Sequence, residues 1–193
     1  RFIADNPDVP VVQMDSVIGN KSGKVLLTMF SRNTNLLLAF LRDHNTARSV
    51  LDVFNDLYAM FGRETYCRLF PVILTDRGSE FSNPVPIEQD ENDELRSLVF
   101  YCNPSAPYQK GGIEVAHELV RRVLPKGKSF DDLQQEVIDL MLSHINSYKR
   151  GKLNSRSAYQ LFNFIYGDDI LPKLNIREIE ANDIVLSPKL LKK

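Results

Sequence analysis

Three carboxylate residues lie in the first two thirds of the sequence, in contexts that would direct them to one point. Asp15 lies inside an apolar run that predicts a buried strand, and Asp76 ends a second such run. Glu114 falls in the first turn of a predicted helix. A carboxylate in a core strand is costly unless it is paired or holds a cation, and three together repel one another. Two Mg²⁺ or Mn²⁺ ions held by acidic side chains are typical of in-line phosphodiester cleavage. We therefore expect Asp15, Asp76 and Glu114 to be catalytic metal ligands.

Each acid also has a simpler structural interpretation. Asp76 could cap the turn that follows it, and Glu114 could be a solvated acid favoured by the helix dipole. The helical spacing places Glu114, His117, Glu118 and Arg121 on one polar stripe, beside an apolar stripe that faces the core. Glu118 is therefore the nearest alternative for the third carboxylate, and His117 on its own is more typical of a surface histidine than of a ligand.

Basic residues cluster around the predicted helix that carries Glu114. The first group consists of Lys110, Arg121, Arg122, Lys126 and Lys128. A second group consists of Lys149, Arg150 and Lys152, with Tyr148 beside them. Lysine and arginine near a carboxylate site suit contacts with phosphates, which position a nucleic acid without reading its sequence. We expect the first group to bind nucleic acid, whereas ordinary surface charge explains the second group equally well.

Two kinds of hydrophobic period predict the elements that position these residues. The predicted strands are 11–18, 24–30, 36–41, 72–75 and 98–102, and the predicted helices are 50–61, 112–124, 130–148 and 157–166. Glycine and asparagine in the first connections indicate two antiparallel hairpins. Thr46 is the predicted N-cap of the first helix and Gly62 its stop, and Ser129 with Asp132 has the spacing of a capping box.

This order of elements predicts an α/β protein with a five-stranded mixed sheet flanked by helices. The helical crossover from the third strand to the fourth favours parallel pairing there. The order matches the ribonuclease H-like fold, in which the first and fourth strands are neighbours, so Asp15 and Asp76 would lie side by side. We expect one catalytic domain over 1–165 and a C-terminal extension over 166–193.

Length and composition are those of one globular domain. The chain has 193 residues, 43% of them hydrophobic and 25% charged, and a net charge of −1, which disfavours binding to DNA through overall charge. Cys67 and Cys102 lack metal-type spacing and suit a reducing compartment. No apolar stretch approaches the roughly 20 residues of a membrane span, and no signal peptide is present. A cytoplasmic location is expected, and the start at Arg1 without a methionine fits a fragment of a longer protein.

Together, these residues resemble the DDE transposase and retroviral integrase superfamily, and more narrowly the bacterial insertion-sequence-thirty family of transposases. Residues 14–19, Met-Asp-Ser-Val-Ile-Gly, are similar to the family's Gly-Asp-Thr-Val-Ile-Gly around its first catalytic Asp. Residues 74–81, Leu-Thr-Asp-Arg-Gly-Ser-Glu-Phe, resemble its Thr-Thr-Asp-Asn-Gly-x-Glu-Phe around the second. Residues 100–111 lead into Glu114 as the family's strand and loop lead into its third acid, and residues 124–127 resemble its Phe-Pro-Lys-Gly. The resemblance covers about residues 11–165.

The sequence departs from the family pattern in three places. Ile113 and Val115 stand where the family usually has asparagine on both sides of the third Glu, and Arg77 replaces the usual asparagine after the second Asp. The stretch between Asp76 and Glu114 is also a few residues longer than usual. All three acids are present, so the resemblance implies catalytic competence, while the changed amides would alter how the helix meets water or DNA.

The resemblance implies a two-metal mechanism. Asp15 and Asp76 would share two Mg²⁺ or Mn²⁺ ions and Glu114 would complete the site, so that water attacks a phosphorus at the transposon end and a 3′ oxygen leaves. The freed 3′-OH would then attack target DNA. The implied partners are double-stranded DNA, as transposon ends and target, and at least a second copy of the chain in the synaptic complex. The implied place of action is the bacterial nucleoid.

Two other functions remain open on the sequence. A nuclease on the same fold would act on RNA–DNA hybrids or junctions without joining strands. A non-catalytic, domesticated core would bind DNA or partner subunits, and the substitutions that flank Glu114 favour it.

Overall fold

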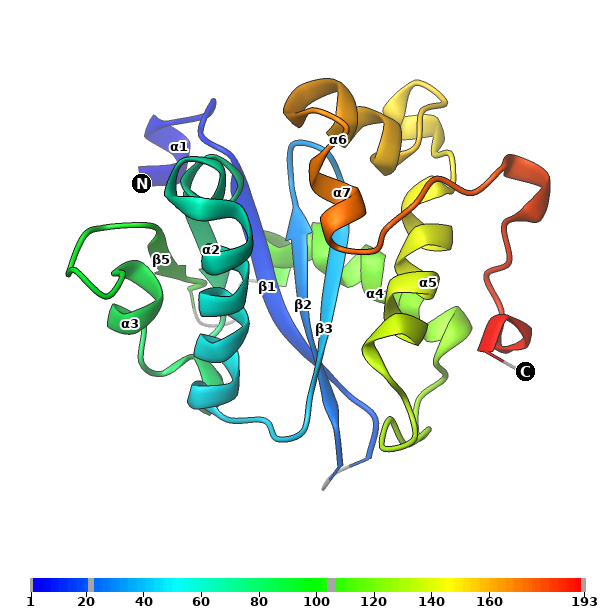
Figure 1. Cartoon of the computed structure of the whole chain (residues 1–193), viewed down its shortest axis with the longest axis horizontal. Helices are drawn as coiled ribbons and strands as arrows, with labels where there is room; N and C mark the ends of the chain where they lie inside the picture. The colour runs from blue at the N-terminus through cyan, green and yellow to red at the C-terminus, as the bar shows by residue number, and fades with distance from the viewer. Residues whose placement is uncertain (1, 21–22, 104–106, 192–193) are drawn as a thin grey trace.

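The computed structural model describes residues 2–20, 23–103 and 107–191, and it has an α/β, ribonuclease H-like fold (Figure 1). A five-stranded mixed sheet has the order β3-β2-β1-β4-β5. The strands are β1 (Val11–Ile18), β2 (Val25–Ser31), β3 (Leu37–Arg42), β4 (Val72–Thr75) and β5 (Leu98–Tyr101). The helices are α1 (Phe2–Asp5), α2 (Ala47–Leu69), α3 (Val85–Glu88), α4 (Gly111–Val123), α5 (Gln135–Ser147), α6 (Ala158–Tyr166) and α7 (Ile170–Lys173). The turn expected at 19–23 and the chain end at 192–193 lie partly outside the described residues.

The structure confirms the five predicted strands, and their ends agree with the prediction to within one residue. β1, β2 and β3 form two antiparallel hairpins, and β4 pairs in parallel with β1 and with β5. The neighbour of β4 is therefore β1, as the fold implied, and not β3, which precedes it in the sequence. All four residues of β4 are buried, which suits a strand between two others more than a strand at the sheet edge.

Alternation along β1 separates the two faces of the sheet. Val12 lines a small cavity with residues of α2, α6 and α7, whereas Gln13 bonds to the backbone at the start of α4. Adjacent strand residues point to opposite faces, so α4 covers one face and α2, α6 and α7 cover the other. Figure 1 shows α4 behind the strands and α2 in front of them. Asp15 shares the face of Gln13.

Two predicted helix ends differ from the structure. Thr46 does cap α2, accepting a hydrogen bond from the backbone N–H of Ser49, but Gly62 only interrupts the helix with a φ of 71°. The chain resumes its helix beyond Gly62 because Tyr66 and Leu69 continue the buried face. The predicted helix over 130–148 begins only at Gln135.

Ser129 does not act as its N-cap, which explains the late start of α5. The Ser129 hydroxyl instead donates to Asp131 Oδ2 at 2.7 Å, and Asp131 Oδ1 accepts from the backbone N–H of Lys24 at 2.8 Å. Asp132, the other half of the predicted box, is exposed. Residues 129–134 therefore form a turn that holds the start of β2.

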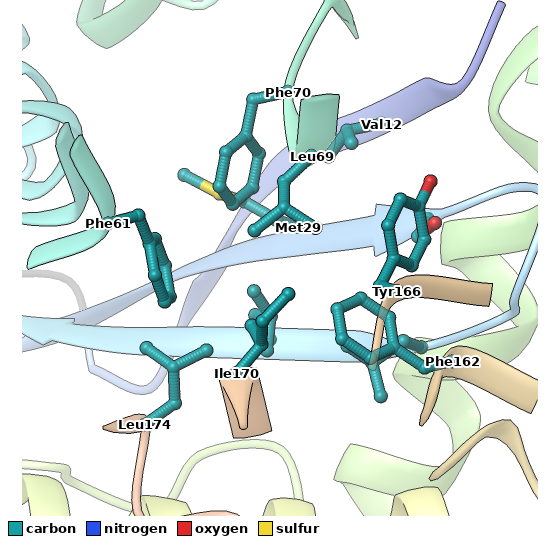
Figure 2. A pocket seen from close by; sticks show the side chains of 12 residues that line it. Val12, Met29, Phe61, Leu69, Phe70, Phe162, Tyr166, Ile170 and Leu174 are labelled. Carbon is teal, nitrogen blue, oxygen red and sulfur yellow. The ribbon is translucent and has the colours of Figure 1, made fainter. Parts of the chain in front are cut away.

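The segment after α6 packs against the same hydrophobic core as the sheet. Leu171 and Ile176 are buried in that core. Ile170 and Leu174 line a cavity of about 20 Å³ together with Phe162 of α6 and strand residues (Figure 2). The division into a domain over 1–165 and an extension over 166–193 stays a prediction. No helix in the described ranges is long and apolar enough to cross a membrane.

Candidate active site

Parallel pairing of β1 and β4 brings Asp15 and Asp76 together. Gln13 pairs with Leu74, so two residues further along the chain Asp15 stands level with Asp76, which directly follows β4. The ammonium of Lys110 lies between them, with Nζ 3.1 Å from Asp15 Oδ2 and 2.8 Å from Asp76 Oδ2. Lys110 is 7% exposed, whereas the Asp76 side chain is 48% exposed. The two acids therefore share one buried cation supplied by the chain itself.

These contacts favour the charged forms of Asp76 and Lys110. Burial disfavours the charged form of Asp76, but hydrogen bonds from Lys110 and from the backbone N–H of Gly78 outweigh it, so the pKa of Asp76 lies below its usual value. Burial likewise acts to lower the pKa of Lys110, and the two carboxylates raise it above its usual value. One ammonium between two carboxylates leaves a net charge of about −1 at this point.

A buried glutamine positions Lys110 and the start of α4. The Gln13 side chain accepts from the backbone N–H of Ile113 at 2.8 Å and donates to the backbone carbonyl of Gln109 at 2.8 Å. Gly112 lets the helix approach this closely, because a Cβ there would lie 2.5 Å from the Phe30 ring and 2.9 Å from Gln13 Oε1. Strand β1 thus fixes the residues on either side of the Gly-Gly pair.

Glu114 lies one turn into α4 and stays outside the bridged pair. Its side chain is exposed, and no three His, Cys, Asp or Glu side chains among the described residues converge on one metal position. His117, on the same side of the helix, is linked to Asp15 through Thr28. Its Nε2 lies 2.8 Å from the Thr28 hydroxyl, which donates to the Asp15 carbonyl at 2.9 Å. Burial lowers the pKa of His117, so the neutral ring with Nε2–H donating to Thr28 fits this contact.

A second polar network holds the segment that follows Asp76. Arg42 is buried and donates to Ser16 Oγ at 3.0 Å and to Asn45 Oδ1 at 2.8 Å. The Asn45 amide in turn donates to Glu80 Oε1 at 3.0 Å. Burial lowers the pKa of Arg42 to about 10, although the charge of Glu80 acts against this. The network joins the turn after β4 to β1 and to the loop before α2, which restricts where Asp76 can lie.

The five predicted nucleic-acid-binding residues divide into two kinds. Lys110 is engaged by the acids, and Arg121 donates to the backbone carbonyl of Ile18 at 2.9 Å, with its other terminal nitrogen buried and without an acceptor in the described part of the chain. Arg122, Lys126 and Lys128 are exposed. Contact of this group with DNA stays a prediction, and the last three are its freely accessible members.

The acid pair suits a divalent cation. Oxygen ligands are those that Mg²⁺ and Mn²⁺ prefer, and the Lys110 ammonium shows that one cationic atom can reach both carboxylates. It stands in for the metal position that the two acids would share. The sequence reasoning missed this role of Lys110 and the anchoring role of Gln13. The only sequence signals were a polar side chain within an apolar strand and a lysine directly before two glycines.

Comparison with known proteins agrees with the fold. No protein-family model matches the chain. It is 28% identical over 151 residues to a protein of Spiroplasma virus SpV1-R8A2 B named as integrase ORF3, and 23% identical over 151 residues to the IS4351 transposase of Bacteroides fragilis. It is 22% identical over 147 residues to the IS30A transposase InsI of Escherichia coli. These alignments cover 78%, 78% and 76% of this chain, but only 45%, 44% and 36% of the relatives, so the chain spans less than half of their length.

Solved structures place the same architecture among viral integrases. The catalytic core domain of BIV integrase aligns with a TM-score of 0.52 and 21% identity, over 81% of this chain and 92% of that one. The chain is thus similar in sequence to transposases and to a viral integrase, and similar in fold to an integrase catalytic core. A chain of the simian T-cell lymphotropic virus intasome aligns with a TM-score of 0.56 and 17% identity, over 88% of this chain and 58% of that one. These structures support the predicted fold, in which Asp15 lies on β1 and Asp76 directly follows the parallel strand β4.

Proposed function

We propose that this chain is the catalytic core of a DDE transposase, a polynucleotidyl transferase that cleaves at transposon ends and joins the 3′-OH to target DNA. The observation that carries the proposal is the pair of carboxylates, Asp15 on β1 and Asp76 directly after the adjacent strand β4 of a ribonuclease H-like sheet, bridged by a single buried cation. The named relatives are transposases and an integrase, which supports DNA as the substrate. Duplex DNA and at least a second copy of the chain are the proposed partners.

Asp15 and Asp76 are the residues that would hold Mg²⁺ or Mn²⁺, with Glu114 as the proposed third ligand and two ions in the working site. A metal bound there would activate the attacking water and stabilise the leaving 3′ oxygen. Lys110 must release both carboxylates before they can bind another cation. Because it precedes α4 directly, we propose that its ammonium then contacts a DNA phosphate, which would reconcile its buried position with the predicted role in nucleic-acid binding.

The side chain of Glu114 is exposed, which supports its proposed role at a site that takes DNA. His117 holds the backbone of Asp15 through Thr28, so it acts as a positioning residue in this proposal. Neutral His117 donates from Nε2 without adding a third positive charge beside Lys110 and Arg121.

Cleavage and strand-transfer assays with matched acid variants test this proposal. We expect Asp15→Asn, Asp76→Asn and Glu114→Gln to abolish both steps while DNA binding persists, and Glu118→Gln, a change at an exposed acid four residues further along α4, to keep both. Loss in Glu118→Gln with activity in Glu114→Gln would exchange their roles. Cleavage without joining would identify a nuclease, and DNA binding without cleavage in the unchanged chain would identify a non-catalytic core.

A further inference from the structure

Positive charge is concentrated between α5 and α6. Four cationic residues occur within the eight residues from Lys149 to Arg156, namely Lys149, Arg150, Lys152 and Arg156. No aspartate or glutamate occurs from residue 140 to residue 167. The whole chain carries a net charge of only −1, so this segment, which we call the basic loop (148–157), differs sharply from the average surface.

The basic loop is closed by its own backbone. Lys149 and Ser157 form an antiparallel bridge, and the backbone N–H of Arg150 donates to the carbonyl of Arg156 at 3.2 Å. Ser157 then caps α6 by accepting from the backbone N–H of Gln160 at 3.1 Å. The backbone that carries the cations is therefore ordered before any ligand arrives, which reduces the ordering cost of binding.

These cations lack counter-charges within the described chain. Lys149, Lys152 and Arg156 are exposed, and no ion pair to any of the four is found among the described residues. Two nitrogens of Arg150, Nε and Nη2, are buried without an acceptor there, and burial lowers the pKa of this guanidinium. A charged group that is partly desolvated and unpaired gains most from an external anion.

An exposed aromatic ring lies beside the same cations. Phe164 on α6 is 80% exposed, and the guanidinium carbon of Arg156 lies 5.9 Å from the centre of its ring. Cations together with an exposed ring at the mouth of a rigid loop suit the sugar-phosphate surface of a nucleic acid, where both charge and apolar edges are presented.

We propose that the basic loop binds the phosphate backbone of duplex DNA as a second contact, away from the acid pair. α6 lies at the end of the sheet where β1 begins, because Asn33 in the β2–β3 turn donates to Tyr166 Oη at 2.8 Å and Arg32 donates its backbone N–H to Val11 O (Figure 1). Asp15 is four residues beyond Val11 on β1, about 13 Å from Val11 at the usual rise of a strand. The proposal rests on the proposed function, and it adds a second point that fixes the direction of the duplex.

Charge-matched variants separate this contact from overall electrostatics. The loop variant carries Lys149→Gln, Lys152→Gln and Arg156→Gln. The control variant carries the same change at three exposed cations elsewhere, Arg48→Gln, Lys173→Gln and Lys189→Gln. Each takes the formal net charge from −1 to −4, since three positive charges are lost in both. Arg150 is left unchanged because of its buried nitrogens, and thermal unfolding checks that both variants fold.

Binding to a fluorescent DNA duplex, measured by anisotropy in EDTA over a range of salt concentrations, is the test. We expect the loop variant to bind about tenfold or more weakly and its salt slope to fall by about 2–3, since each lost phosphate contact removes about 0.9. The control variant should bind within about twofold of the unchanged chain. Equal losses in both variants would overturn the basic loop as a contact. If the unchanged chain cleaves and joins DNA but the loop and control variants bind the duplex equally well, only the proposed contact at the basic loop is refuted. An unchanged chain that binds no duplex refutes both proposals.

Discussion

Lys110→Met would remove the ammonium between Asp15 and Asp76 while keeping the length of an unbranched side chain. Charge-assisted hydrogen bonds contribute about 1.5–3 kcal/mol each. The Asp76 side chain is 48% exposed, so water recovers part of the interaction that is lost. We therefore expect the metal-free variant to be less stable by about 1–3 kcal/mol, which lowers the Tm by about 2–10 °C in a chain of this size.

The same change should strengthen metal binding. In the unchanged protein a divalent ion must displace Lys110 from both carboxylates, and in Lys110→Met that displacement cost is absent. A difference of about 1–3 kcal/mol corresponds to an increase in Mg²⁺ affinity of about fivefold or more. Because ligand binding stabilises the folded state, added Mg²⁺ should also raise the Tm of Lys110→Met more than that of the unchanged chain.

Calorimetric titration with Mg²⁺ and thermal unfolding with and without Mg²⁺ measure both effects. Lys126→Met is the matched control, because Lys126 is an exposed lysine beyond the end of α4. Asp76→Asn shows whether the binding occurs at the proposed site, since it should lose most of the affinity. A Lys110→Met variant that binds Mg²⁺ no more tightly than Lys126→Met does would contradict the expected increase in affinity.

Three further predictions concern the parts that support this site. Gln13→Leu leaves the backbone N–H of Ile113 and the carbonyl of Gln109 without their partner, so the free energy of unfolding in urea should fall by about 2–4 kcal/mol, and cleavage should fall even in the fraction that is folded. Leu171→Ala should cost about 2–5 kcal/mol in the same urea measurement, and a value near zero would mean that 166–193 is not part of the folding unit. His144 accepts from the backbone N–H of Val185 at Nδ1, and burial lowers its pKa, so its contribution to stability is complete above about pH 6.5 and is lost as the pH falls through its folded pKa. Unfolding at about pH 7.5 and pH 5 should show that loss, and His144→Gln should make the dependence shallower.

Much of the fold could be predicted from local sequence patterns. The apolar runs around Asp15 and before Asp76 gave the two central strands because strand burial leaves a pattern within a few residues. The helix ends were harder to predict, because a residue typical of a helix end can have another structural role. Gly62 predicts the end of the first helix, yet the buried residues beyond it continue the helix. Ser129 has the spacing of a cap, but its hydroxyl bonds Asp131 instead.

The residues that position the acids could not be predicted because their partners are distant in the sequence. Gln13 contacts Gln109 across 96 residues, and Lys110 contacts Asp15 across a similar distance. No window of the sequence contains both members of either pair. The spacing of Asp15 and Asp76 does not predict that they meet. That prediction came from the order of strands in the fold that the chain resembles.

The neighbouring carboxylates of Asp15, on β1, and Asp76, directly after β4, do share a cation in the structure, but that cation is a lysine. Acid count alone therefore does not distinguish a metal site from an internal ion pair. The charge balance is a further observation: one ammonium faces two carboxylates, and the Asp76 side chain is 48% exposed. A single ion pair needs only one acid, and the second acid adds repulsion between carboxylates that one ammonium offsets only in part. The surplus negative charge at an accessible point would attract a divalent cation, to which a third carboxylate could then bind.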